Sequence, residues 1–142
     1  MLTGIRSLIL LWSEVTDIVG ERIRPNVLHS SDGSAPSIKL ELVSGSQQNF
    51  LDRSGCLIDG VLEVTSRSEL ASEAALVAEM VRSRGENPSI GLDGYSGSVG
   101  SGVLKSAERI DFDSGGELLD DGSESGLFVH IDRYQILFEI GG

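Results

Sequence analysis

Cysteine, proline and aromatic residues are scarce in this chain of 142 residues, which contains 1 Cys, 3 Pro and 5% aromatic residues. Because Cys56 stands alone, no internal disulfide can form, and small secreted scaffolds usually depend on several. The apolar run Leu8–Trp12 spans five residues, whereas a signal peptide needs about 7–15 and a membrane helix about 20. We therefore expect a protein made in the cytoplasm, with no membrane partner.

Basic residues are scarce as well. The chain has 11 Lys and Arg against 22 Asp and Glu, which gives a net charge of −11. A protein that binds phosphates tightly needs clustered Lys and Arg, so the composition argues against tight binding of nucleic acid or of an anionic membrane. Residues 1–30 are neutral, but residues 91–142 hold three basic and ten acidic residues, a net charge of −7. The acidity is thus concentrated in the C-terminal part of the chain.

Residues with catalytic or metal-binding chemistry do not form a recognisable pattern. His29 and His130 are the only histidines, and neither lies in the close cluster of Cys, His or carboxylate ligands that a zinc site requires. The Gly-rich stretch 91–102 follows a predicted helix and precedes a predicted strand, the reverse of a dinucleotide-binding loop, and it lacks the Lys-Ser/Thr pair of a P-loop. We predict no catalytic, cofactor-binding or metal-binding residue, no cofactor and no enzymatic activity.

Hydrophobic periodicity predicts two helices. Apolar residues at steps of three and four predict the first helix over residues 3–19, just before Gly20. The second is predicted over residues 69–84, because Ser66 and Glu69 have the spacing of a capping box and Gly85 suits the position after the helix.

Alternating apolar and polar residues predict the strands. Ile38, Leu40 and Leu42 alternate with charged residues, which is typical of a half-buried strand. Gly60 lies inside another strand and predicts a bulge or a close backbone approach. Strands are predicted over residues 22–29, 38–42, 56–65, 103–112 and 127–140, and flexible loops near 44–55, 91–102 and 113–126. We expect one domain over residues 1–142 of the α+β class, with a mostly antiparallel sheet of about four to five strands and two helices packed on one face.

With its elements in this order, nearly the whole chain resembles the tail-completion or tail-terminator (head–tail joining) proteins of tailed bacteriophages and gene transfer agents. The resemblance begins with Gly20-Glu21-Arg22-Ile23-Arg24-Pro25 after the first helix and continues with Ala35-Pro36-Ser37-Ile38. A strand over 58–65 that leads directly into an Ala-rich helix also fits the family. The ending carries the resemblance best, with Asp120-Asp121-Gly122 before the long strand Leu127–Ile140.

This resemblance implies a virion structural protein, not an enzyme. Family members form a ring, usually a hexamer, that caps the head-proximal end of the tail tube, stops tube polymerisation and joins the tail to the head connector. The implied partners are further copies of the chain, the tail tube protein and the connector or stopper protein, while DNA passes through the channel without specific binding. The implied location is the tail or neck of a virion assembled in the host cytoplasm.

Two sets of residues are candidates for contacts in such a ring. The basic candidates for partner docking or subunit contacts are Arg22, Arg24, Arg53 and Lys105. The acidic candidates, in a stretch without Lys or Arg, are Asp111, Asp113, Glu117, Asp120, Asp121 and Glu124. These acids either line the channel, where repulsion keeps DNA from sticking, or solvate the outer wall. Ring closure requires head-to-tail contacts, for which the neutral N-terminal part, residues 1–30, is the better candidate.

The sequence leaves two alternative functions open. The nearest is another neck protein, such as a head-closure or adaptor protein. The alternative of a different class is a free-standing ligand-binding or enzymatic α+β domain. A ring in solution or on tube ends favours the terminator. A stable monomer with a deep pocket favours the free-standing ligand-binding or enzymatic domain.

Overall fold

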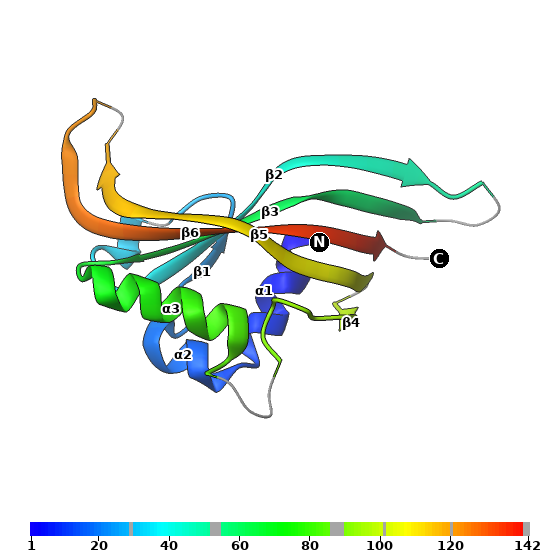
Figure 1. The fold of residues 1–142 in the computed structure, drawn as a ribbon, viewed down its shortest axis with the longest axis horizontal. Coiled ribbons are helices and arrows are strands. Elements are labelled where there is room, and N and C mark those ends of the chain that lie inside the picture. Colours follow the sequence, from blue (N-terminus) through cyan, green and yellow to red (C-terminus); the bar gives the residue numbers. More distant parts are fainter. Residues whose placement is uncertain (29, 52–54, 86–89, 101, 120, 141–142) are drawn as a thin grey trace.

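The computed structural model of the chain describes residues 1–28, 30–51, 55–85, 90–100, 102–119 and 121–140. Figure 1 shows the helices gathered below a long sheet, from which two hairpins extend at opposite ends. The elements in chain order are α1 (Leu2–Leu10), α2 (Ser13–Val19), β1 (Ile23–Pro25), a 3-10 turn (Ser30–Asp32), β2 (Ser37–Asn49), β3 (Cys56–Ser68), α3 (Ala71–Ser83), β4 (Gly97–Val99), β5 (Gly102–Leu118) and β6 (Glu124–Ile140).

The six strands form one mixed sheet in the order β1-β2-β3-β6-β5-β4. Strand β1 runs parallel to β2, and the other neighbours are antiparallel. The sheet curls into a half-barrel that carries three helices (Figure 1). The expected sheet of four to five mostly antiparallel strands with two helices is therefore wrong. The prediction did not include β4, a three-residue strand inside the Gly/Ser stretch. It also did not include the parallel pairing of β1, which no local pattern reveals.

The predicted first helix is broken in two at Trp12. This residue has extended backbone angles, φ −95° and ψ 104°, and is the N-cap residue just before α2. The apolar stripe nevertheless stays on one side, because Ile5, Ile9 and Val15 are all fully buried and Trp12 is 3% exposed. The stripe was thus correctly predicted as core, although the continuous helix was not.

Two segments predicted as loops are largely strand. Strand β2 continues to Asn49, and β5 continues to Leu118 before β6 starts at Glu124. These extensions build two long hairpins, the β2–β3 arm (residues 43–61) and the β5–β6 arm (residues 110–128), at opposite ends of the sheet (Figure 1). Polar and Gly-rich composition masked the strands because the arms lie outside the core, where alternation of apolar residues is not needed.

The predicted capping box at Ser66 and Glu69 is also wrong. Ser66 is fully buried, and β3 continues for two residues beyond it. Leu70 is the residue before α3, and no side chain caps the helix there. The Ser68 hydroxyl accepts a hydrogen bond from the Leu70 backbone N–H at 3.2 Å and donates to Glu73 at 2.6 Å. Helix α3 therefore begins at Ala71, two residues later than predicted.

The core lies between the helices and the inner face of the sheet. Tyr134, Ile136 and Phe138 alternate along β6 and are at most 2% exposed, as their spacing predicts. They pack in one cluster with α1, α2 and α3. The central strands β3 and β6 pair without interruption from Cys56–Ile140 to Ser68–Phe128.

The prediction for Gly60 is confirmed. The register between β2 and β3 shifts between Leu42 and Ser44, next to Gly60. A Cβ atom on Gly60 would overlap the Ser44 carbonyl oxygen and come within 2.9 Å of the Gly45 Cα. Only a residue without a side chain lets β2 approach β3 this closely.

We therefore expect Gly60→Ala to lower the free energy of unfolding by about 1–3 kcal/mol, because the backbone must move to admit the methyl group. Gly116→Ala is the matched control, since a Cβ at Gly116 meets no atom within 4 Å. Urea unfolding of both variants measures the difference. Equal stability of the two variants would contradict the close approach.

Candidate functional site

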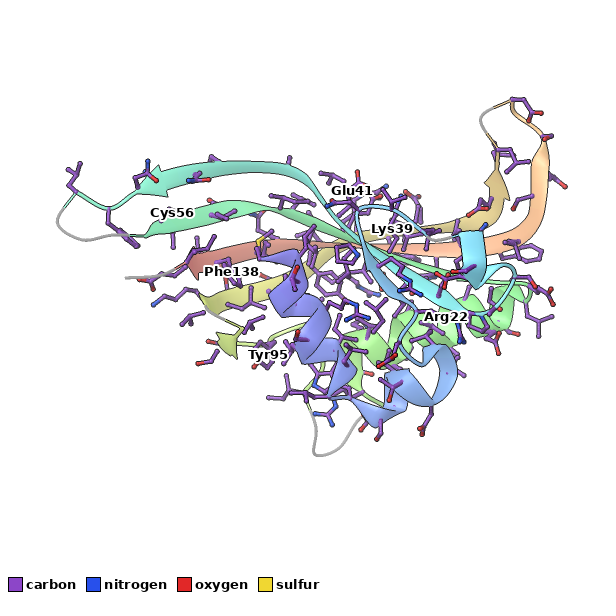
Figure 2. All side chains as sticks on the ribbon, turned by 180° about the vertical axis from the view of Figure 1, so that it is seen from behind. Arg22, Lys39, Glu41, Cys56, Tyr95 and Phe138 are labelled. Atoms are coloured by element: carbon purple, nitrogen blue, oxygen red, sulfur yellow. The ribbon has the colours of Figure 1, made fainter. Side chains whose placement is uncertain are left out.

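All three helices lie on one side of the sheet, and we call the opposite side the uncovered face (Figure 1). Directly paired residues of antiparallel strands share a face. Glu41 pairs with Glu63, Glu63 with Arg133, and Arg133 with Asp111. Four strands thus place charged side chains in one row across the uncovered face. In Figure 2, Glu41 is seen on β2 close to Lys39, whose ammonium lies 3.5 Å from its carboxylate.

Arg133 is the centre of this row. Its Nη1 atom lies 2.9 Å from Oδ1 of Asp111 and 2.9 Å from Oδ2 of Asp113, and its Nε atom lies 3.3 Å from Glu63. The hydrogen bonds to Asp111 and Asp113 raise the pKa of the Arg133 guanidinium. Two acids of the predicted cluster are therefore held together on the uncovered face by one cation.

Glu117 is held at a second place. Its carboxylate accepts two hydrogen bonds from Arg67 of β3, at 2.7 and 2.8 Å. The Arg67 guanidinium lowers the pKa of Glu117 below its ordinary value. In Figure 1 the β5–β6 arm bends away from the helices. This two-pronged ion pair ties the arm to β3 across 50 residues of sequence.

The remaining predicted acids lie at the end of the same arm. Asp121 accepts hydrogen bonds from the backbone N–H of Ser123 at 2.9 Å and from its hydroxyl at 2.6 Å, and these bonds lower the pKa of Asp121. Glu124 begins β6 and is exposed. Asp120 lies outside the described residues. The structure thus distributes the predicted cluster over three places along the arm.

Two of the predicted basic contact residues, Arg22 and Arg24, are engaged within the chain. Arg22 donates to the carbonyls of Pro36 at 2.7 Å and Ile18 at 3.3 Å. Arg24 makes two hydrogen bonds to the buried Asp32, at 3.1 and 2.8 Å, which raise the pKa of the arginine. These bonds fix β1 against the segment before β2.

The other two basic candidates lie elsewhere. The ammonium of Lys105 lies 3.1 Å from a carboxylate oxygen of Glu139, and its side chain is 48% exposed. Arg53 lies outside the described residues. A contact role for any of these four residues stays a prediction.

Every Lys and Arg in the part of the chain that the structure describes has a partner within the chain. Arg6 and Arg22 donate to backbone carbonyls. All the others lie within 4.0 Å of a carboxylate: Arg24, Lys39, Arg67, Arg82, Arg84, Lys105, Arg109 and Arg133. In these described ranges, each positive side chain is thus engaged with a group of its own chain.

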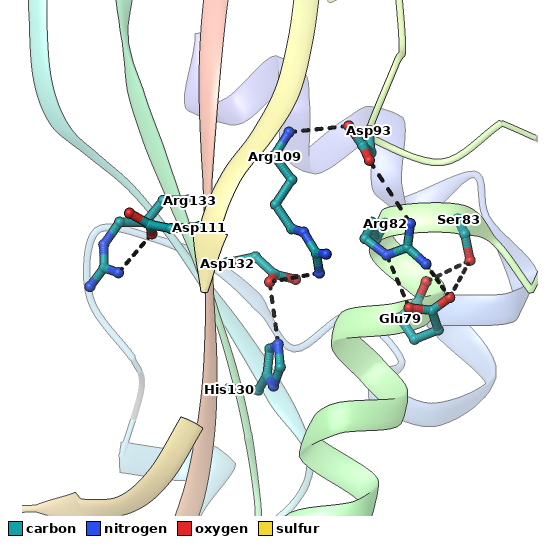
Figure 3. Close-up of polar contacts among 9 residues, drawn as sticks. All are labelled: Glu79, Arg82, Ser83, Asp93, Arg109, Asp111, His130, Asp132 and Arg133. Carbon is teal, nitrogen blue, oxygen red and sulfur yellow. Dashed lines mark hydrogen bonds and ion pairs between the residues drawn. The ribbon is translucent and has the colours of Figure 1, made fainter. Parts of the chain in front are cut away.

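Sequence reasoning missed a polar network between β6 and α3, drawn in Figure 3. Asp132 is 1% exposed, and its Oδ1 atom lies 3.2 Å from Nε2 of His130 and 3.6 Å from Nη1 of Arg109. Burial raises the pKa of Asp132, while His130 and Arg109 oppose that shift. The alternation His130-Ile131-Asp132 could have indicated that the two side chains share a face.

The network continues to the helix. Glu79 accepts from Arg82 at 3.0 Å through Nε and from the Ser83 hydroxyl at 3.0 Å, and Arg82 lowers the pKa of Glu79. Asp93 lies 3.9 Å from Arg82 and accepts from the Arg109 backbone N–H at 3.1 Å. These contacts lock α3 to β5 and β6 (Figure 3), so we interpret the network as structural.

Neither a metal site nor a membrane-spanning helix emerges from the described ranges. Within them, no group of three His, Cys, Asp or Glu side chains is arranged to hold a metal ion. No helix in the same ranges is long and apolar enough to cross a membrane.

No protein-family profile and no curated protein sequence matches the chain. A solved structure does match. The match is to a chain in the virion of a native gene transfer agent (GTA) particle, with a TM-score of 0.66 over 98% of this chain and 94% of that chain. The two chains share a fold. Their sequences are 11% identical, so the likeness concerns the fold alone.

The ion pair between Arg67 and Glu117 predicts a pH-dependent contribution to stability. Glu117→Gln should lower the free energy of unfolding at neutral pH by about 0.5–1 kcal/mol, because the side chains are mostly but not fully buried. The pKa of Glu117 is lowered in the folded chain. The extra stability that the ion pair gives the parent chain is therefore present above the ordinary pKa of Glu. It is lost as the pH falls through the lowered pKa.

Denaturation at neutral and acidic pH measures this difference. Glu124→Gln, on the same arm, is the control and should change stability little at either pH. A Glu117→Gln deficit that stays the same in acid would contradict the ion pair.

Proposed function

We propose that this chain is a structural protein of a phage-like particle and acts as its tail terminator. In this role, copies form a ring, hexameric by analogy with the family, that caps the head-proximal end of the tail tube, stops tube polymerisation and joins the tail to the head connector. The observation that carries the proposal is the shared fold with a virion chain over nearly the full length of both. The sequence resemblance supports the finer assignment.

The shape of the molecule is compatible with head-to-tail contacts. The two arms extend at opposite ends of the sheet (Figure 1), so each copy offers different surfaces to its two neighbours, as a ring requires. Residues 1–30 carry no net charge. Leu11, between α1 and α2, is 78% exposed and lies in this neutral part. We propose that the neutral part provides the packing between subunits, because acidic surfaces repel one another.

The uncovered face suits the wall of a channel. Glu63, Asp111 and Asp113 converge on Arg133, so this face presents more negative than positive charge in its central row. Such a surface repels the phosphates of DNA and carries no excess cation that would hold them. We propose that this face points into the ring and that DNA passes it without being bound.

Ring formation can be tested with a substitution that does not disturb the fold. We expect Leu11→Asp to abolish ring formation, because it places a charge in the proposed packing surface, while an exposed side chain contributes little to folding. Leu119→Asp, at a residue 50% exposed near the end of the acidic arm, is the matched control and should keep the ring.

Light scattering and native mass spectrometry measure the assembly, alone and with tail tubes. A parent chain that stays monomeric even on tube ends would contradict the ring. In particles that lack the chain, electron microscopy should reveal full heads separate from over-long tails. Joined particles with tails of normal length would contradict the terminator role.

A further inference from the structure

A groove of about 390 Å³ lies between the start of α3 and the β5–β6 arm. Its lining includes Ala71 and Ala75 of α3, Gly115 of β5 and Phe128 of β6. The side chain of Phe128 is 39% exposed, and a Cβ atom added to Gly115 would meet no atom within 4 Å. Small residues beside an exposed aromatic ring thus leave an open apolar groove, which is a feature of interaction sites.

The β2–β3 arm carries an exposed apolar side chain at the other end of the sheet. Among the residues that the structure describes, Leu51 is the most exposed large apolar one. In Figure 1 the β2–β3 arm extends at one end of the sheet, whereas the start of α3 and the β5–β6 arm lie at the opposite end. Leu51 and the groove therefore do not meet within one chain. Head-to-tail repetition of the chain brings this arm of one copy toward the groove of the next.

Charge favours the β2–β3 arm over the β5–β6 arm as the occupant of the groove. Residues 110–128 contain six Asp and Glu and no Lys or Arg, so the β5–β6 arms of two copies repel one another. Residues 43–51, the described part of the β2–β3 arm that ends at Leu51, contain no charged side chain. This segment therefore enters the groove without adding like charge and without the cost of burying an ion.

We infer that Leu51 of one copy inserts into the groove formed by Ala71, Ala75, Gly115 and Phe128 of the next copy. Each copy then provides one arm and one groove, so the contact is heterologous and repeats around a closed ring. The inference rests on the proposed ring, to which it adds a contact besides the packing of residues 1–30.

Cysteine cross-linking tests this contact directly. Chains with Leu51→Cys are mixed with chains with Ala75→Cys, in solution and on tail tubes, and are oxidised with oxidised glutathione. We expect a disulfide-linked dimer in the mixture and none with either variant alone. Val27→Cys in place of Leu51→Cys is the control, because Val27 is 67% exposed and lies after β1, outside both arms. No linked dimer, or as much of it with Val27→Cys, would overturn the inference.

Substitutions on both sides of the contact test its strength. Leu51→Asp places a charge on the occupant and Ala75→Trp fills the groove, so each should weaken self-association about tenfold, as for a central apolar anchor. The controls are Val27→Asp and Leu76→Trp, because Leu76 is 48% exposed on the same helix but lies outside the groove lining. Sedimentation measures the association, and circular dichroism confirms that each variant is folded.

The outcomes separate this inference from the proposed function. A ring that is as stable with Leu51→Asp and Ala75→Trp as with their controls would overturn the inference and leave the ring in place. A parent chain that stays monomeric in solution and on tube ends would overturn both. Tails of normal length in particles that lack the chain would contradict the terminator role alone, because the cross-link between copies does not depend on tail length.

Discussion

The uninterrupted pairing of β3 with β6 is the constraint on which the rest of the structure depends. It extends from Cys56–Ile140 to Ser68–Phe128 without a register shift. On one face it turns Tyr134 and its alternating neighbours into the core beneath the helices. On the other it sets Arg133 beside Glu63, from where the guanidinium reaches Asp111. A slip by one residue would exchange these faces, burying the ion pairs and exposing the core.

The parts of the fold that alternate and lie over the core could be predicted from the sequence. The stripe around Trp12, the strand at Ile38 and the glycine approach at Gly60 all follow from local pattern. The arms could not be predicted, because exposed strand needs no apolar alternation. Pairing is also non-local: nothing near Glu117 indicates that Arg67, 50 residues away, binds it. Hence the acids were identified as a set, while the places where Asp111, Asp113 and Glu117 are held were not.

Charge links the fold to the proposed function. In the part of the chain that the structure describes, the Lys and Arg side chains are engaged within the chain, and the net charge of the whole chain is −11. We propose that the acids on the uncovered face repel the phosphates of DNA. The imbalance of charge thus fits the proposed passage of DNA.

The orientation of the sheet in the assembled ring tests the central claim most directly. A cryo-electron microscopy reconstruction of the ring on a tail tube would place Arg133 and its carboxylate partners relative to the channel. We predict that the uncovered face lines the channel and that the helices lie outside it. A ring in which Asp111 and Asp113 lie wholly on the outer wall, with the helices toward the channel, would contradict it.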